Sequence, residues 1–283
     1  MLRLERLPSF NGVAAGAVAT INVPLGPTYN SFILRTNADI SSTATNLGAS
    51  DWDTVFDEFR ILIDGRITYQ GEVGYLVKLA QFYGETLRAG TLPIFLSNPW
   101  ARSLFGEDIT AYGTAGGLSN MTIELGIKEN QSVNELKMFA QQSAPRPFGK
   151  HLVLRKISRA FGSTGIDEIA DVPRGAHSLI GLDVTHTGID EVEILAAGTR
   201  VHDSDKETRE QTLLMSGRVK QTGMTHVDFC PRNRVAVLRE TEGGGKMFEA
   251  EAFPMAVNDF RVKLTHTSAP SNYDVYLREI HDR

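Results

Sequence analysis

Hydrophobic and polar residues alternate along most of the chain with a period of two, the pattern of strands that bury one face. Alternating or short apolar segments, bounded by Gly, Pro, Asn and Asp, recur in both halves. In the first half they are 18–23, 31–36, 59–63, 67–69, 92–96, 121–127 and 135–140. In the second half they are 152–157, 178–184, 192–196, 227–230, 234–238, 259–265 and 273–280. Regular short strands of this kind are typical of a β-sandwich or barrel.

Two segments have a helical period instead. In 72–87, apolar residues recur every three or four positions, between Gly71 and Gly90. Segment 205–215 follows Ser204, and Glu207 stands three residues after that serine, which is the capping-box pattern of a helix start. Each half therefore contains one predicted helix, at a comparable place among its strands.

The two halves can be aligned block by block. Arg6, Gly16 and 23–26 match Arg155, Gly165 and 172–175 at an offset of 149 residues. Segment 59–65 matches 192–198 at 133, and Phe95 matches Phe229 at 134. Ile123, Leu125, Leu136 and Met138 match Val262, Leu264, Val275 and Leu277 at 139. Because the blocks keep their order and the offset changes in loops, the chain is predicted to hold two copies of one β-rich unit.

The alignment also predicts the domain organisation. Segment 38–52 is a polar insertion in the first half without a counterpart in the second, and 141–149 has the composition of a linker. We expect an N-terminal domain over 1–143 and a C-terminal domain over 144–283. Eight antiparallel strands in each domain, with long connections, favour a jelly roll over an immunoglobulin-type sandwich. The predicted fold is all-β: two tandem eight-stranded jelly rolls, each with one inserted helix.

Composition narrows the class of protein. The 283 residues are 41% hydrophobic and 22% charged, enough to bury a core, so disorder is not expected. The single cysteine, Cys230, excludes an internal disulfide and a multi-cysteine zinc site, and it is interpreted as a small hydrophobe. The start of the chain lacks the apolar stretch of a secretion signal, so we expect folding in a reducing cytoplasm. A net charge of −5 argues against a surface devoted to nucleic acid.

No catalytic arrangement can be assembled from the motifs. Segment 243–246 (GGGK) lacks the flanking residues of a phosphate-binding loop, and 113–117 (GTAGG) predicts a mobile loop rather than a dinucleotide site. A cupin-type metal site needs His-x-His, which is absent, and His177 and His186 are nine residues apart and so fall on opposite faces of a strand. We expect no enzyme activity and no catalytic, cofactor-binding or metal-binding residues.

Two weaker possibilities remain open. The acidic clusters Asp51, Asp53, Asp57 and Glu58, and Asp203 and Asp205, could hold calcium, although neither has the spacing of a helix-loop-helix calcium loop. A basic stretch, with Arg146, Lys150, Arg155, Lys156 and Arg159 and no acid among them, could bind phosphate or an acidic neighbour, but such runs are more often a solvated face.

Several strand segments resemble a known family. They are 6–10 (RLPSF), 19–24 (ATINVP) and 26–29 (GPTY) near the start, and 260–264 (FRVKL) and 273–277 (YDVYL) near the end. With the tandem jelly rolls, they resemble the double jelly-roll major capsid proteins of tailless, membrane-containing bacteriophages, and the corticovirus-type coat protein in particular. The resemblance covers essentially the whole chain, and its motifs are strand signatures rather than site signatures.

The resemblance implies a virion protein. Three subunits would form a pseudo-hexagonal capsomer, and capsomers would tile an icosahedral shell around a lipid membrane and the genome. The implied partners are further copies of the chain, a vertex or penton protein, and the inner membrane with its small membrane proteins, without sequence-specific nucleic acid binding. Segments 38–52 and 103–118 would decorate the outside or clasp neighbours, and 1–10 or 146–159 would face the membrane. The competing interpretations are a carbohydrate-binding or cupin-like jelly roll, and a minor vertex protein.

Overall fold

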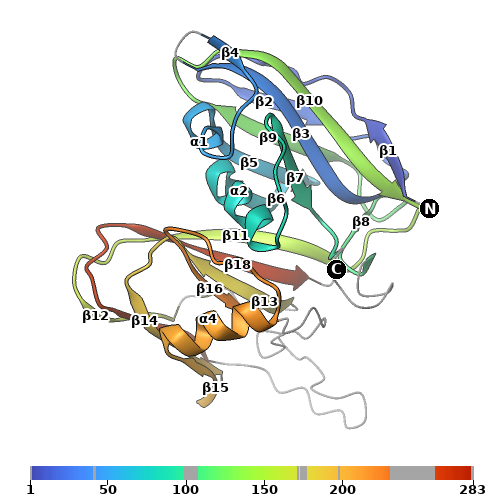
Figure 1. Cartoon of the computed structure of the whole chain (residues 1–283). Coiled ribbons are helices and arrows are strands. Elements are labelled where there is room, and N and C mark those ends of the chain that lie inside the picture. Colours follow the sequence, from blue (N-terminus) through green and yellow to red (C-terminus); the bar gives the residue numbers. More distant parts are fainter. Residues whose placement is uncertain are drawn as a thin grey trace. The chain divides into compact units, whose positions relative to one another are not determined.

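The fold is known from a computed structural model, which describes residues 2–40, 43–98, 108–170, 172, 177–196, 198–229 and 259–281. The chain divides into two compact units, here called unit 1, up to Arg155, and unit 2, from Lys156. Each is described by itself (Figure 1).

Unit 1 is a sandwich of two antiparallel four-stranded sheets. One sheet has the order β1 (Arg3–Arg6), β10 (Val133–Ser143), β3 (Thr28–Ile40) and β7 (Thr91–Phe95). The other has the order β2 (Val18–Asn22), β9 (Met121–Ile127), β5 (Phe56–Ile63) and β6 (Arg66–Glu72). The short strands β4 (Thr43–Thr45) and β8 (Tyr112–Gly113) also pair with β3. Helix α1 (Trp52–Val55) precedes β5, and helix α2 (Val73–Phe82) connects β6 to β7.

Unit 2 is built in the same way. Its first sheet has the order β11 (His151–Arg159), which begins in unit 1, then β18 (Tyr273–His281), β13 (His177–Val184) and β16 (Thr225–Asp228). Its second sheet has the order β12 (Gly165–Ile169), β17 (Phe260–His266), β14 (Ile189–Ala196) and β15 (Thr199–Ser204). Helix α4 (Lys206–Met215) connects β15 to β16, as α2 connects β6 to β7.

The two units share one topology. When the eight described sandwich strands of each unit are numbered 1 to 8 in chain order, both units have one sheet of order 1-8-3-6 and one of order 2-7-4-5. These are the strand orders of a jelly roll. The register repeats as well, since Ile61 lies opposite Ile123 in unit 1 and the aligned pair, Ile194 and Val262, lie opposite each other in unit 2. All four side chains are fully buried. The double jelly roll predicted from the sequence is therefore confirmed.

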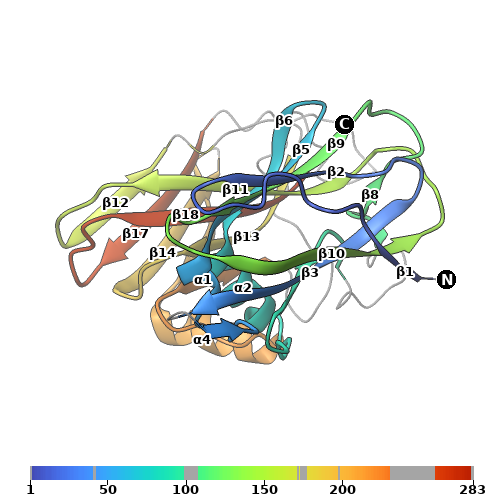
Figure 2. The same ribbon diagram turned by 90° about the horizontal axis from the view of Figure 1, so that it is seen from above.

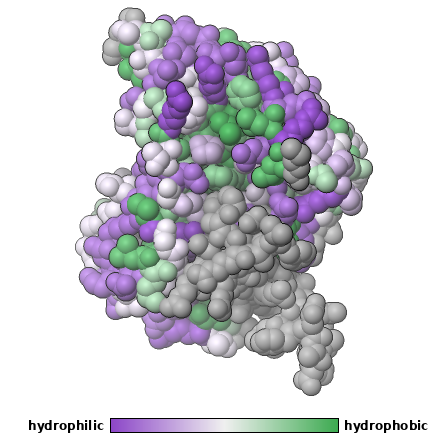
Figure 3. Space-filling view, turned by 45° about the vertical axis from the view of Figure 1, so that its right-hand side comes forward, coloured by the Kyte–Doolittle hydropathy of each residue, from purple (hydrophilic) through white to green (hydrophobic). Residues whose placement is uncertain are grey.

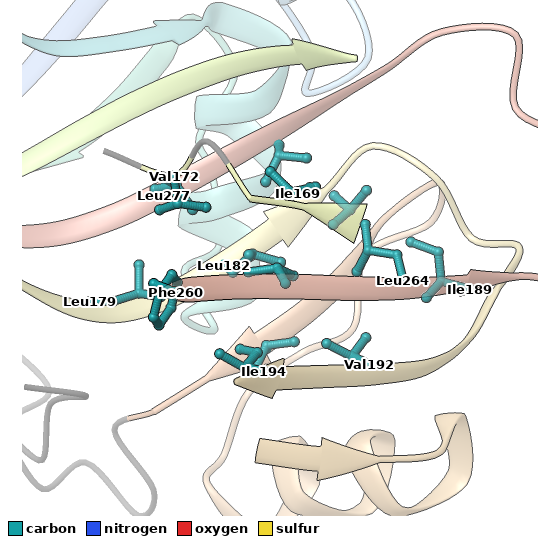
Figure 4. Packing of buried hydrophobic residues seen from close by; sticks show 14 of the residues in the cluster. Ile169, Val172, Leu179, Leu182, Ile189, Val192, Ile194, Phe260, Leu264 and Leu277 are labelled. Carbon is teal, nitrogen blue, oxygen red and sulfur yellow. The ribbon is translucent and has the colours of Figure 1, made fainter. Parts of the chain in front are cut away.

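The core of each unit lies between its two sheets. In unit 2 the inward side chains of both sheets interdigitate, and Figure 4 shows Leu182 and Leu277 of one sheet with Val192, Ile194 and Leu264 of the other. Burial of alternate residues on strands such as β9 and β17 is what the period-two pattern predicted.

Local details differ from the prediction. Helix α2 ends at Phe82 rather than Leu87, because Gly84 adopts φ +88° and turns the chain. Helix α4 is capped by Asp205, whose Oδ1 accepts from the Thr208 amide at 2.7 Å, and not by Ser204, which ends β15. The expectation of one helix per unit is wrong for unit 1, whose described residues also contain α1. The predicted strand 234–238 lies outside the described residues.

The domain boundary after residue 143 stays a prediction. The division by contacts falls twelve residues later, at Arg155. The reason is that segment 144–150, which overlaps the predicted linker 141–149, docks on unit 1, as the contacts of Arg146 and Phe148 below describe. The first strand of the second copy begins after it, at His151.

The repeat predicts matched effects at two turns. Gly65 and Gly198 occupy equivalent turns after β5 and β14, and both have φ +77° with no atom within 4 Å of an added Cβ. The positive φ, and not a lack of room for a side chain, is therefore what requires glycine at both positions. Gly65→Ala and Gly198→Ala are each expected to lower the free energy of unfolding by about 1–2 kcal/mol. Urea unfolding of the full chain measures this. Gly162→Ala, equally open but without a positive φ, is the control and should cost nothing; unequal effects at the two turns would contradict their equivalence.

Candidate functional site

Several carboxylates of the acidic clusters are engaged inside the fold. Asp51 accepts from the Gly48 amide at 2.9 Å and from Ser50 Oγ at 3.1 Å, which shapes the turn into α1. In the second cluster, Asp203 pairs with Arg200 at 2.8 Å and Asp205 caps α4. In the part of the chain that the structure describes, no group of three or more His, Cys, Asp or Glu side chains is placed to hold a metal ion. The calcium hypothesis gains no support from this geometry.

The glycine segment 113–117 is partly built into unit 1, so the expectation of a mobile loop is wrong for its start. Gly113 belongs to β8 and lies opposite Thr28 of β3. A Cβ on Gly113 would lie 2.4 Å from the Pro147 carbonyl oxygen, so the absence of a side chain lets the linker approach. The other glycine motif, 243–246, and Cys230 lie outside the described residues.

The linker itself is anchored to unit 1. The Arg146 guanidinium donates to the carbonyls of Ile109 and Ala111, and burial lowers the pKa of Arg146. The Phe148 ring packs edge-on against Tyr112 at 5.9 Å, and the Phe148 amide donates to the Gly116 carbonyl at 2.8 Å. The segment 144–150 therefore behaves as part of unit 1 rather than as a flexible connection.

The basic stretch is engaged in the same internal way. Besides Arg146, Lys156 pairs with Asp274 at 3.3 Å and Arg159 with Asp167 at 2.8 Å. A hydrogen bond with Asp167 raises the pKa of Arg159. Because these cations already have partners in the fold, the stretch is a poor candidate for a surface that binds phosphate or lipid headgroups.

Unit 2 contains a buried ionic cluster on the face of the β13–β16–β18 sheet that points away from the core. Asp183 is fully buried, and its carboxylate accepts from Arg278 Nε at 3.0 Å and lies 2.7 Å from His226 Nδ1. Arg278 lies directly over Gly181, where an added Cβ would be 2.1 Å from Nη2. Beside it, the buried pair Arg218 and Asp228 is joined at 2.7 Å. Buried charges persist only when they are paired, and the pairs of this cluster join the three strands β13, β16 and β18.

The sequence analysis missed this cluster. Asp183 stands between the core residues Leu182 and Val184, so the alternation places it on the outer face, where a charged residue is unremarkable. Its partner Arg278 is 95 residues away in the chain. A signal existed in Gly181, a glycine inside a strand, which is a mark of close approach by another group.

Exposed apolar side chains form the other candidate for function. Leu2 and Leu4 on and beside β1 are 59% and 61% exposed, and Leu214, Met215 and Val219 at the end of α4 are 50–65% exposed. On the face shown in Figure 3, hydrophobic side chains occur as patches among hydrophilic ones. Helix α2 buries seven of its ten residues, whereas α4 buries only Arg209 and Leu213. Apolar patches of this kind are typical of contact surfaces between proteins.

A small cavity adjoins α4. Its volume is about 40 Å³, and its lining includes Arg209, Leu213, Lys220 and His226. This space holds a few water molecules and is far smaller than the cavities of several hundred Å³ that bind ligands. The cavity therefore does not favour the alternative of a carbohydrate-binding or cupin-like protein. No helix among the described residues is long and apolar enough to cross a membrane.

Comparisons with known proteins cover both units. The family model of the viral coat protein P2 N-terminal domain matches residues 4–143, and that of the P2 C-terminal domain matches residues 153–281. The major capsid protein P2 of Pseudoalteromonas phage PM2 is 24% identical over an alignment of 278 residues, which covers 94% of this chain and 91% of that protein.

Solved structures share the fold. The crystal structure of the major capsid protein P2 from bacteriophage PM2 matches with a TM-score of 0.81 at 22% identity, over 100% of this chain and 98% of that one. The crystal structure of the STIV MCP matches with a TM-score of 0.65 at 11% identity, over 99% of this chain and 97% of that one.

Proposed function

The chain belongs to the family of viral coat proteins P2, and from this premise we propose that three copies form a capsomer of pseudo-hexagonal outline that tiles an icosahedral shell. It is a structural protein of the viral capsid, not an enzyme, and its place is the virion. The observation that carries the capsomer proposal is the shared topology of the two units, since the two sheet orders of unit 1 recur in unit 2.

The geometry of a duplicated chain supports a trimer. Three chains with two similar units each present six similar units around one axis, so a threefold assembly approximates sixfold symmetry and can pack in a hexagonal layer. On this proposal the domains 1–143 and 144–283 are the two quasi-equivalent halves of each subunit. The exposed apolar side chains at the end of α4 are available for the contacts between subunits.

The proposal also includes partners other than further copies of the chain. A purely hexagonal layer is flat, so a closed shell needs a different protein at its fivefold vertices, and we include such a vertex protein among the partners. We also propose that the shell encloses a lipid membrane with small membrane proteins, and that subunits fold in the host cytoplasm. Of the two segments considered for the membrane side, 1–10 is favoured over 146–159. Leu2 and Leu4 are exposed beside Arg3, whereas the basic stretch is engaged internally.

The trimer is tested by mass in solution. Sedimentation equilibrium of the purified full chain is expected to give three times the chain mass of 31.1 kDa. Electron microscopy of the same material should show hexagonal capsomers or shells, and phospholipid analysis of isolated particles tests the enclosed membrane. A chain that stays monomeric at all concentrations, or that forms a closed dimer, contradicts the capsomer proposal.

A further inference from the structure

Three connections meet at one end of unit 2. They are 160–164 between β11 and β12, 185–188 between β13 and β14, and 267–272 between β17 and β18, seen at the left of Figure 2. Two of them are joined by their backbones, since the Thr267 amide donates to the Gly188 carbonyl at 2.8 Å. A Cβ on Gly188 would lie 2.0 Å from Ser268 Oγ and 2.6 Å from His186 Nε2, so this close packing depends on a glycine.

His266 lies at the centre of this end. This residue ends β17 and is only 2% exposed. Its ring packs against three others, with centroid distances of 5.0 Å to Phe161, 5.3 Å to Tyr273 and 5.4 Å to His186. Each of the three connections, or the strand beside it, thus contributes a ring. Within the described residues neither ring nitrogen of His266 has a hydrogen-bond partner. An imidazole held in this way is adapted to the uncharged form, because a buried charge without a hydrogen bond is costly.

The groups that face His266 are of both signs. His186, from the connection after β13, is half-buried, and its Nε2 lies 3.2 Å from the Ser268 carbonyl oxygen. Asp167 of β12 is bonded to Arg159 of β11 and accepts from the hydroxyl of Tyr273 of β18. The Asp167 carboxylate is thereby already neutralised by Arg159. It is not free to compensate a second positive charge on His266.

The pKa directions agree with this geometry. Burial lowers the pKa of His266, the neighbouring His186 lowers it further, and Asp167 opposes both. Burial raises the pKa of Asp167, but the hydrogen bonds from Arg159 and Tyr273 outweigh it and the net direction is downward, so Asp167 stays ionised in mildly acidic solution.

We propose that His266 is the acid-sensitive element of a clasp at this end of unit 2. Uncharged, the His266 ring holds the three connections together through its ring contacts. When the ring is charged, it repels His186 and needs hydration, and the connections therefore separate. The clasp gives the second jelly roll, and any assembly built from it, an end that opens on acidification while the rest of the core stays closed.

The direction of the pH effect follows from proton linkage. A histidine in an unfolded chain titrates near pH 6.5, whereas His266 in the closed clasp binds its proton at a lower pH. Between these two values the open state binds more protons than the closed one. The clasp is therefore fully stable above about pH 6.5 and loses stability as the pH falls below it, by up to about tenfold in its opening constant per pH unit.

Hydrogen exchange of the full chain, read by mass spectrometry and corrected for the intrinsic exchange rate, tests the proposal. Between pH 7.5 and 5.5, the opening constants of 160–168, 185–189 and 265–272 are expected to rise by about tenfold, while those of unit 1 change little. In His266→Phe, which keeps a ring but cannot be charged, this rise should disappear. A wild-type chain without the rise, or a variant that keeps it, overturns the proposal.

A matched control and a second measurement keep the result interpretable. His202 is another histidine of unit 2 whose pKa is lowered by burial, but it lies on β15, so His202→Phe should leave the pH response of the clasp intact. If His266→Phe does not fold, NMR titration of the His266 ring in the native chain decides directly. A pKa below 6.5 supports the clasp, and a value at or above 6.5 contradicts it.

Discussion

Replacing Asp183 with alanine is expected to lower the free energy of unfolding of unit 2 by about 3–5 kcal/mol. The Asp183 carboxylate is fully buried and is bonded to Arg278 Nε, whose side chain is 3% exposed. Without the carboxylate, the guanidinium stays buried between strands and loses the charge with which it is paired, which costs more than the ion pair itself contributes. Urea unfolding of the full chain, together with hydrogen exchange of β13, β16 and β18, measures the loss and locates it.

Two further variants separate this explanation from a general effect of lost charge. Asp203→Ala removes an exposed carboxylate that also pairs with an arginine, Arg200, and it should change stability by less than about 0.5 kcal/mol. The double variant Asp183→Leu with Arg278→Met removes both buried charges and should recover most of the loss, because apolar residues of similar size can replace a buried ion pair. If Asp183→Ala costs less than about 1 kcal/mol, the cluster does not fix the sheet.

Much of the fold could be predicted because jelly-roll strands bury alternate residues. Strands β9 and β17 have core residues at every second position, so the pattern and the repeat were both visible there. The short strands β1, β12 and β15 were missed. They have few buried residues and depend on pairing with β10, β17 and β14, which no local pattern reveals.

Function was less accessible from local residues than from the repeat and the family resemblance. The buried cluster of Asp183, His226 and Arg278 and the ring contacts of His266 both join segments far apart in the chain. Such contacts depend on strand register, which the sequence specifies only through the whole fold. Local composition indicated a basic surface over 146–159. In the fold, basic side chains of this segment instead form ion pairs within the chain.

The insertion 38–52 shows how composition can mislead. Its polar residues predicted a surface segment, and the described part contains the end of β3, the strand β4 and the first residue of α1. Yet Leu47 and Trp52 are fully buried, and the Trp52 ring packs 5.8 Å from Phe56. The insertion therefore ends inside the core of unit 1, whatever its exposed residues contact in an assembly.

Trp52→Ala is for this reason expected to lower the free energy of unfolding of unit 1 by about 3–5 kcal/mol, because the largest fully buried side chain of the described residues would be replaced by a cavity. Urea unfolding of the full chain and hydrogen exchange of α1, α2 and β5 measure the effect. Thr43→Ala, at an exposed position of the same insertion, should cost less than about 0.5 kcal/mol.

The contrast between these two variants also separates the two possible roles of the insertion. If the segment acted only as a clasp between subunits, Trp52→Ala would weaken assembly and leave the isolated subunit as stable as before. Because Trp52 is buried within one chain, we expect the cavity to lower the stability of the isolated subunit. Weaker assembly would then follow from the less stable subunit. Unfolding measured below the concentration at which subunits associate distinguishes the two, and an unchanged unfolding midpoint there would show that the insertion is not part of the core.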